Sequence, residues 1–210
     1  GSSVAAPNLL MARAHGAKSV VCTRPSPIGG RRFDLALLPH HQWGQGEENA
    51  TRLLGVPTHI TPQAVARKRD ELALANSGEP LPALGLLFGG DDRRYSWTLE
   101  AARKVVESLI AVASRAGLQV AVATSRRTPS NVTEYIRARV TQSPVCAYAA
   151  FPDDEPPKHD AVITVLAHSV WTAVTVDSFS MVCEAASAGT PVGLIEIPSR
   201  RPDRYAAAFD

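Results

Sequence analysis

Short apolar blocks alternate with helical periodicity along the second part of the chain. Each block is bounded by glycine, proline or polar residues, as expected for a buried strand. The blocks are residues 83–88, 118–123, 145–148, 171–176 and 192–197. The helical segments between them are residues 96–116, 131–140, 160–168 and 181–188. Strands that alternate with helices need crossovers, so this pattern predicts a parallel sheet covered on both faces.

The first part of the chain has a sparser pattern of the same kind. A helix is predicted from Val4 to His15 and again from Pro62 to Ala75. Three short strands are predicted between these helices, at residues 19–22, 33–38 and within 53–60. Residues 76–80 have the composition of a linker. We therefore predict a partial N-terminal α/β domain over residues 1–79 and a C-terminal Rossmann-like nucleotide-binding domain over residues 80–210.

The composition narrows the class of protein. The 210 residues are 45% hydrophobic and carry a net charge of +2 spread along the chain, so we expect a soluble protein that does not bind nucleic acid. Cys22, Cys146 and Cys183 lack the spacing of a zinc site or a disulfide framework, and we find neither a leader nor an apolar run of about 20 residues. These features indicate a cytoplasmic protein, and the alanine- and arginine-rich composition hints at a bacterial source. The opening Gly1-Ser2-Ser3, without Met, indicates either that a tag remnant replaces natural residues or that an N-terminal segment, with a first strand, has been cut away.

Three loops follow strands of the predicted C-terminal sheet, at the edge where such sheets bind ligands. In the first loop, Gly89 and Gly90 lack a Cβ, so the backbone could approach a phosphate. The alternative is a tight turn without a ligand. In the second loop, Ser125, Arg126, Arg127 and Thr128 offer hydroxyls and guanidiniums to a phosphate. The alternative is a solvated basic turn with Thr128 as a helix N-cap before Pro129.

The third loop joins a strand to a helix N-terminus, which favours anions. Ser178, Ser180 and Met181 lie there, and Glu184 follows about one turn later. The Glu184 carboxylate could accept two hydrogen bonds from a ribose diol while phosphates sit at the helix end. The alternative is a capping arrangement, in which Ser178 or Ser180 caps the helix and Glu184 only complements its dipole.

Several of these segments carry a family resemblance. SRRTP at residues 125–129 and VTVDSFSMVCEAASAGTPVG at residues 174–193 are the most specific, with weaker support from residues 33–41, 48–61 and 88–97. On these motifs the chain resembles the bacterial and plant mitochondrial-fission (elongated-mitochondria type) family, whose members look like GT-B glycosyltransferases. The resemblance implies two Rossmann-type parallel-sheet domains, with the N-terminal one small or truncated.

The resemblance also implies roles for individual residues. The 174–193 segment is similar to the donor-nucleotide motif of the peptidoglycan N-acetylglucosaminyltransferase, which implies ribose binding by Glu184. It places the diphosphate near the following residues: Gly89, Gly90, Ser178, Ser180 and Met181. The first domain would bind the acceptor, and His41 would be the general base. The family's Pro-Glu-His-Asp is here Pro39-His40-His41-Gln42, so the base lacks its carboxylate neighbours.

Two functions from different classes follow. The first is metal-independent transfer of sugar from a nucleotide-sugar donor to an unknown glycan, lipid or protein acceptor, with a peripheral membrane association left open and no metal cofactor expected. His41 acts as base in this hypothesis, or is an ordinary loop histidine beside Trp43. The second is a non-catalytic adaptor that keeps the fold for protein–protein interaction. A nucleotide-sugar epimerase would need a GxGxxG turn, which is absent. The histidines at positions 15, 59, 159 and 168 are expected to be ordinary surface or helix-end residues.

Overall fold

The computed structural model describes residues 2–43, 48–76 and 78–199, which fall into two compact units. The first unit ends at Pro57 and the second begins at Thr58. Each contains a parallel sheet, so the predicted α/β class with two Rossmann-like sheets is confirmed. The division between the units differs from the boundary expected at residues 79 and 80, because helix α2 packs with the second unit.

The first unit is built on a sheet that we call the small sheet. Its strands are β1 (Val20–Cys22), β2 (Leu35–Pro39) and β3 (Ala50–Leu53), paired in that order and in parallel. Helix α1 (Ala5–Ala14) and the 3-10 turns η1 (Ser2–Val4), η2 (Gly30–Arg32) and η3 (His40–Gln42) complete the unit. Ala5, Val21, Phe33, Ala36 and Leu38 form its core.

The third strand lies earlier than the sequence indicated. The expectation of a strand within residues 53–60 is wrong, because β3 ends at Leu53. Gly55 and Pro57 interrupt the later segment, and a proline cannot donate to a ladder. Asn49 instead fixes the start of β3, since its side chain donates hydrogen bonds to the carbonyls of Gly30 and Phe33.

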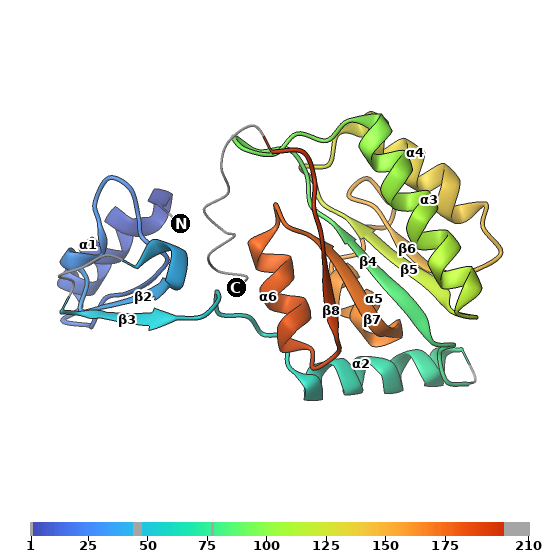
Figure 1. Cartoon of the computed structure of the whole chain (residues 1–210). Coiled ribbons are helices and arrows are strands. Elements are labelled where there is room, and N and C mark those ends of the chain that lie inside the picture. Colours follow the sequence, from blue (N-terminus) through green and yellow to red (C-terminus); the bar gives the residue numbers. More distant parts are fainter. Residues whose placement is uncertain (1, 44–47, 77, 200–210) are drawn as a thin grey trace. The chain divides into compact units, whose positions relative to one another are not determined.

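The second unit contains the large sheet, whose strands are parallel. They are β4 (Ala83–Phe88), β5 (Gln119–Thr124), β6 (Cys146–Ala150), β7 (Ser169–Thr175) and β8 (Val192–Ile195). Their spatial order is β6-β5-β4-β7-β8 (Figure 1). Successive strands thus run outward from β4 in one direction and then, from β7, in the other. This is the doubly wound arrangement, in which ligands bind beyond the carboxyl ends of the strands where the order reverses.

In the described part of the second unit, five helices accompany the large sheet: four pack on its strands, and the first of them in the chain packs on another helix. They are α2 (Pro62–Ala75), α3 (Leu99–Arg115), α4 (Ser130–Thr141), α5 (Ala161–His168) and α6 (Phe179–Ser187). Helices α3 and α4 pack side by side, α5 packs against the central strands, and α6 packs on β7 and β8 (Figure 1). Among the described residues, no helix is long and apolar enough to cross a membrane.

Helix α2 is fixed at its start and along its length. Pro62 begins the helix, as the sequence predicts, and the Thr61 hydroxyl caps it by accepting a hydrogen bond from the amide of Ala64. The Arg69 guanidinium donates to the carbonyl of Ala167 at 2.9 Å, and Lys68 pairs with Asp160. These contacts attach α2 to α5 and explain why the second unit starts before the predicted linker.

Candidate functional site

A cavity of about 700 Å³ lies at the carboxyl edge of the large sheet. We call it the edge cavity. Its walls come from the segments that follow β5, β6 and β7 and from the first turns of α5 and α6. The lining residues are Thr124, Ser125, Arg126, Arg127, Ala150, Phe151, Pro152, Pro157, Lys158, His159, Ala161, Val162, Ser178, Ser180, Met181 and Glu184. The volume is in the range of small-molecule sites.

The edge cavity brings together most of the predicted ligand-binding residues. Some come from the loop after β5, and the others come, about fifty residues later, from the end of the loop after β7 and from α6. The predicted residues that line it are Ser125, Arg126, Arg127, Ser178, Ser180, Met181 and Glu184. Gly89, Gly90 and Thr128 are not among its lining residues, and His41 lies in the first unit.

The two glycines after β4 serve a close contact inside the protein. A Cβ on Gly89 would collide with the Asp177 carboxylate, and a Cβ on Gly90 would collide with the backbone of Arg127. The Gly89 amide donates to the Thr175 hydroxyl at 2.7 Å, and the Gly90 amide donates to Asp177 Oδ2 at 2.6 Å. Both amides therefore have acceptors within the protein, as the alternative of a tight turn without a ligand requires. Contact of these amides with a phosphate stays a prediction.

Thr128 connects two loops. Its hydroxyl donates to the carbonyl of Gly89 and accepts from the Ser125 amide, at 3.1 Å in the latter case. The alternative that made Thr128 the N-cap of the next helix is wrong: helix α4 begins at Ser130, and the residue at its N-cap position is Pro129. Thr128 instead holds the loop after β5 against the loop after β4.

The two arginines of the second loop differ in their surroundings. The Arg127 guanidinium lies 3.4 Å from Asp177 Oδ2, and its backbone amide donates to Ser125 Oγ at 2.9 Å. The side chain of Asp177 is fully shielded from solvent, and this burial raises the pKa of its carboxyl, while Thr175, the Gly90 amide and Arg127 act in the opposite direction. Arg126 is exposed and, among the described residues, makes no hydrogen bond or ion pair. Arg127 is thus held in place, and Arg126 remains available to a ligand.

The N-terminus of α6 faces the edge cavity. Ser178 is at the N-cap position, but its side chain makes no capping hydrogen bond. The capping role proposed as the alternative for Ser178 is therefore not realised. Helix amides in the first turn lack intrahelical acceptors and attract anions. Ser180 and Met181, within that turn, line the cavity.

Glu184 lies in the second turn of α6 and lines the edge cavity. Its side chain is half-buried and makes no hydrogen bond or ion pair with another described residue. Burial raises the pKa of its carboxyl, and the neighbouring His59 acts in the opposite direction. The carboxylate therefore offers both of its oxygens to donors in the cavity.

The sequence reasoning missed the wall formed after β6. Lys158 and the exposed His159 both line the edge cavity. Arg137 pairs with Asp153 and Asp154, and Lys158 pairs with Asp154 at 3.1 Å. The available signal was a basic pair directly after an acidic, proline-rich segment that follows a strand of the same sheet.

His41 occupies the turn η3, directly after β2. It therefore lies at the carboxyl edge of the small sheet, as predicted from its place after an apolar strand. Its neighbour His40 lies with Nδ1 2.7 Å from the Arg52 guanidinium. Across the described ranges, no group of three or more His, Cys, Asp or Glu side chains is arranged to hold a metal ion.

Comparison with known protein families identifies the family of this chain. A family model described as mitochondrial fission ELM1 matches residues 1–210. No curated protein matches the chain. The match covers both units, and it agrees with the resemblance found in the residue motifs.

Proposed function

The chain belongs to the mitochondrial fission ELM1 family, and from that premise we propose that its second unit binds a nucleotide-sugar in the edge cavity. The proposed activity is the one that the motif resemblance implies: metal-independent transfer of the sugar to an acceptor by a GT-B-type, glycosyltransferase-like protein. One observation carries the proposal. Two guanidiniums, a helix N-terminus and a half-buried carboxylate converge on a single cavity of about 700 Å³.

The diphosphate has a suitable place in the edge cavity beside the N-terminus of α6. Arg126 and Arg127 can donate paired N–H groups to phosphate oxygens, and the first-turn amides near Ser180 add the positive end of a helix dipole. Lys158 also lines the cavity, with its ammonium paired to Asp154. When the sugar leaves, these groups stabilise the negative charge that develops on the diphosphate.

The nucleoside has a suitable place nearer Glu184. A carboxylate accepts hydrogen bonds only, so it matches the two hydroxyl donors of a ribose. Phe151, Pro152 and Val162 give the same cavity an apolar wall for the base. A free phosphate or a simple sugar would leave this wall uncovered, which favours a nucleotide over either fragment.

The acceptor half of the proposal rests on the first unit. His41 is the proposed general base there, since an imidazole can take a proton at neutral pH. The substitution His41→Gln should leave nucleotide binding unchanged and abolish transfer. Loss of nucleotide binding in that variant would contradict the assignment of donor and acceptor roles to different units.

Calorimetric titration of the whole chain with UDP, GDP, ADP, CDP and their sugars tests the donor site. We expect one base to bind, and Glu184→Gln to weaken its binding by about 1–3 kcal/mol, because a charged acceptor is lost. Glu79→Gln is the matched control, since Glu79 is exposed and precedes β4 at the opposite edge of the sheet. Equal affinities of the parent and of a folded Glu184→Gln variant would sink the ribose role.

The same titrations at several salt concentrations test the phosphate contacts. Arg126→Ala should weaken binding and flatten its salt dependence, because one guanidinium no longer meets the phosphates. Arg115→Ala, at the exposed end of α3, is the control and should change neither the nucleotide affinity nor its salt dependence. Absence of binding by every nucleotide in the parent chain would favour the adaptor function instead.

A further inference from the structure

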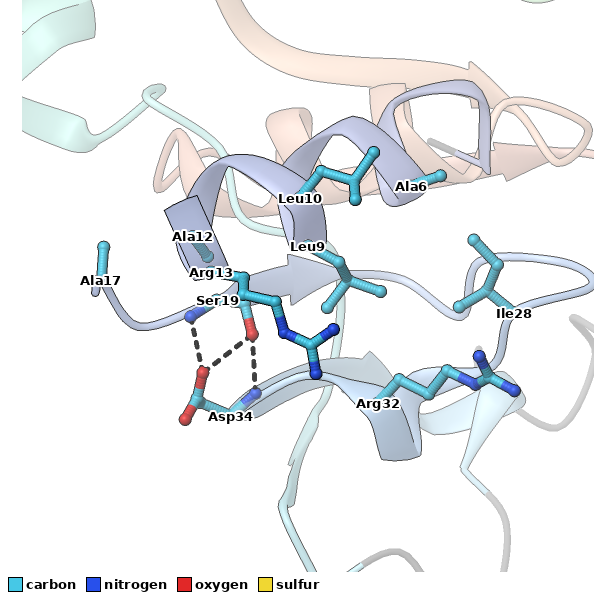
Figure 2. A pocket seen from close by; sticks show the side chains of 10 residues that line it. All are labelled: Ala6, Leu9, Leu10, Ala12, Arg13, Ala17, Ser19, Ile28, Arg32 and Asp34. Atoms are coloured by element: carbon cyan, nitrogen blue, oxygen red, sulfur yellow. Dashed lines mark hydrogen bonds between the residues drawn. The ribbon is translucent and has the colours of Figure 1, made fainter. Parts of the chain in front are cut away.

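A second hollow lies wholly within the first unit. It measures about 790 Å³ and runs between α1 and the segment that leads into β2. We call it the α1 groove. Figure 2 shows the side chains of Leu9, Arg13, Ile28 and Arg32 gathered in this space. Ser19 and Asp34, which also line it, precede β1 and β2, so the groove lies at the amino edge of the small sheet, opposite the edge that carries His41.

The carboxylate in the lining already has its donors. Asp34 Oδ2 accepts hydrogen bonds at 2.8 Å from both the amide and the hydroxyl of Ser19, and Oδ1 lies 3.0 Å from Lys18 Nζ (Figure 2 shows the Ser19 contacts). These contacts lower the pKa of Asp34 to about 2. Its charge is therefore balanced by Lys18 and does not need either arginine of the groove.

The two arginines of the α1 groove come from different elements of the first unit. Among the residues that the structure describes, neither Arg13 nor Arg32 makes a hydrogen bond or ion pair. The C-terminal turn of α1 accounts for a cation at Arg13, because helix ends favour positive charge there. It does not account for Arg32, which lies in the turn η2 on the other wall. Two positive charges from separate elements thus border one hollow.

The remaining walls are apolar. Leu9 and Ile28 are half-buried and pack against the core of the first unit, and Leu10 is 68% exposed at the groove. An anion without an apolar part would leave these side chains in water. A purely apolar ligand would leave both guanidiniums unused. Only a ligand with both kinds of surface matches the lining.

We propose that the α1 groove binds an amphiphile with one anionic head, a carboxylate or a phosphate monoester, on a hydrocarbon chain. The head pairs with Arg13 and Arg32, for which both anions have suitable acceptor geometry. The chain lies along Leu9, Leu10 and Ile28. This site is separate from the edge cavity and does not depend on nucleotide binding.

Titration of the whole chain with decanoate and decyl phosphate, below their micellar concentrations, tests the proposal. At least one should bind, and its affinity should fall about tenfold or more in Arg13→Gln and in Arg32→Gln. Arg31→Gln is the matched control, because Arg31 is an exposed neighbour that does not line the groove, and its affinity should stay unchanged. Equal losses in all three variants would overturn the proposal in favour of general charge attraction.

Three further experiments separate the contributions of the anionic head, the hydrocarbon chain and a membrane surface to binding. Acetate and inorganic phosphate supply the heads without the chain, and a neutral decyl glycoside supplies the chain without the charge; both should bind about tenfold more weakly or not at all. Leu10→Ser should weaken decyl phosphate but not inorganic phosphate. Sedimentation with phosphatidylcholine vesicles, with and without phosphatidic acid, tests a membrane surface. Binding to acidic vesicles without any binding of the single amphiphiles would overturn the groove as the site.

Discussion

The large and small sheets are both parallel, but they differ in how completely they are packed. All six residues of β4 are buried, and Leu86 and Leu87 have no exposed surface. Helix α1, in contrast, buries only Ala5 of its ten residues, and Leu10 and Met11 are mostly exposed. The comparison teaches that the same parallel architecture can bury a central strand completely in one unit and leave a covering helix largely exposed in the other.

The loops repeat this contrast. After β4 the space beside Gly89 and Gly90 is filled by Asp177 and the backbone of Arg127. In the first unit, Gly29 has a φ of +77° and would have nothing within 4 Å of an added Cβ. Gly89 and Gly90 are therefore required by close packing, whereas Gly29 is required by its backbone conformation alone.

The largest expected effect is that of Gly90→Val, which places a branched side chain against the Arg127 backbone. We expect it to destabilise the second unit by more than about 3 kcal/mol, since neither loop can move without breaking the Gly90–Asp177 and Thr128–Gly89 contacts. Gly29→Ala should cost the first unit only about 1 kcal/mol. Hydrogen exchange resolved by peptide measures both units in one sample. Similar losses of stability in Gly90→Val and Gly29→Ala would contradict the difference in packing between the two loops.

Truncation of a buried leucine should give the next largest effect. Leu86→Ala removes a fully buried side chain from β4 and should cost about 3 kcal/mol. Leu9→Ala removes a half-buried side chain from α1 and should cost about 1 kcal/mol. Urea unfolding followed by hydrogen exchange in β4 and in β2 separates the two values. A cost for Leu9→Ala as large as that for Leu86→Ala would show that α1 is packed more tightly than its exposure indicates.

The smallest expected effect is a difference in pH dependence between two aspartates. The folded pKa of Asp34 is lowered from 3.8 to about 2, so its contribution to stability is present above pH 3.8 and is lost as the pH falls toward 2. The folded pKa of Asp177 is raised, so its contribution is fully present below the unfolded pKa and is lost as the pH rises through the folded value. The two units should therefore respond to acid in opposite directions at these groups.

Asp34→Asn and Asp177→Asn measure these two contributions. Each profile of stability against pH is compared with that of the parent, so that other titrating groups cancel. Asp34→Asn should remove the loss of stability that the first unit shows at low pH. Asp177→Asn should remove the gain of stability that the second unit shows at low pH. High salt should reduce the Asp34 effect, because that carboxylate and Lys18 are exposed. Parallel changes in both units would contradict the assignments.

Much of the large sheet could be predicted from the sequence, because its segments are long and strongly periodic. The predicted bounds of α2 and β4 agree with those observed, and every strand of that sheet was expected within a few residues of its place. The third strand of the small sheet was misplaced, because its pairing with β2 depends on the tertiary contact of Asn49 rather than on local apolar periodicity. The unit boundary was equally hidden, since the packing of α2 on α5 leaves no local pattern.

The residues of the edge cavity could be predicted only in part. Loops after parallel strands meet at one edge, so the convergence of Arg126, Ser180 and Glu184 follows from topology. The internal use of Gly89 and Gly90 does not, because glycine is equally suited to a ligand and to a buried carboxylate. Only the folded structure shows that a buried carboxylate lies beside Gly89.

The strand order of the large sheet has a consequence for the timing of folding during synthesis. Strand β4 gains one partner, β5, soon after it is made, but its other partner, β7, is formed by residues 169–175. Until those residues leave the ribosome, one edge of the most apolar strand has no hydrogen-bonding partner. The nascent chain therefore passes through a stage in which a chaperone, or a strand of another chain, can compete for β4.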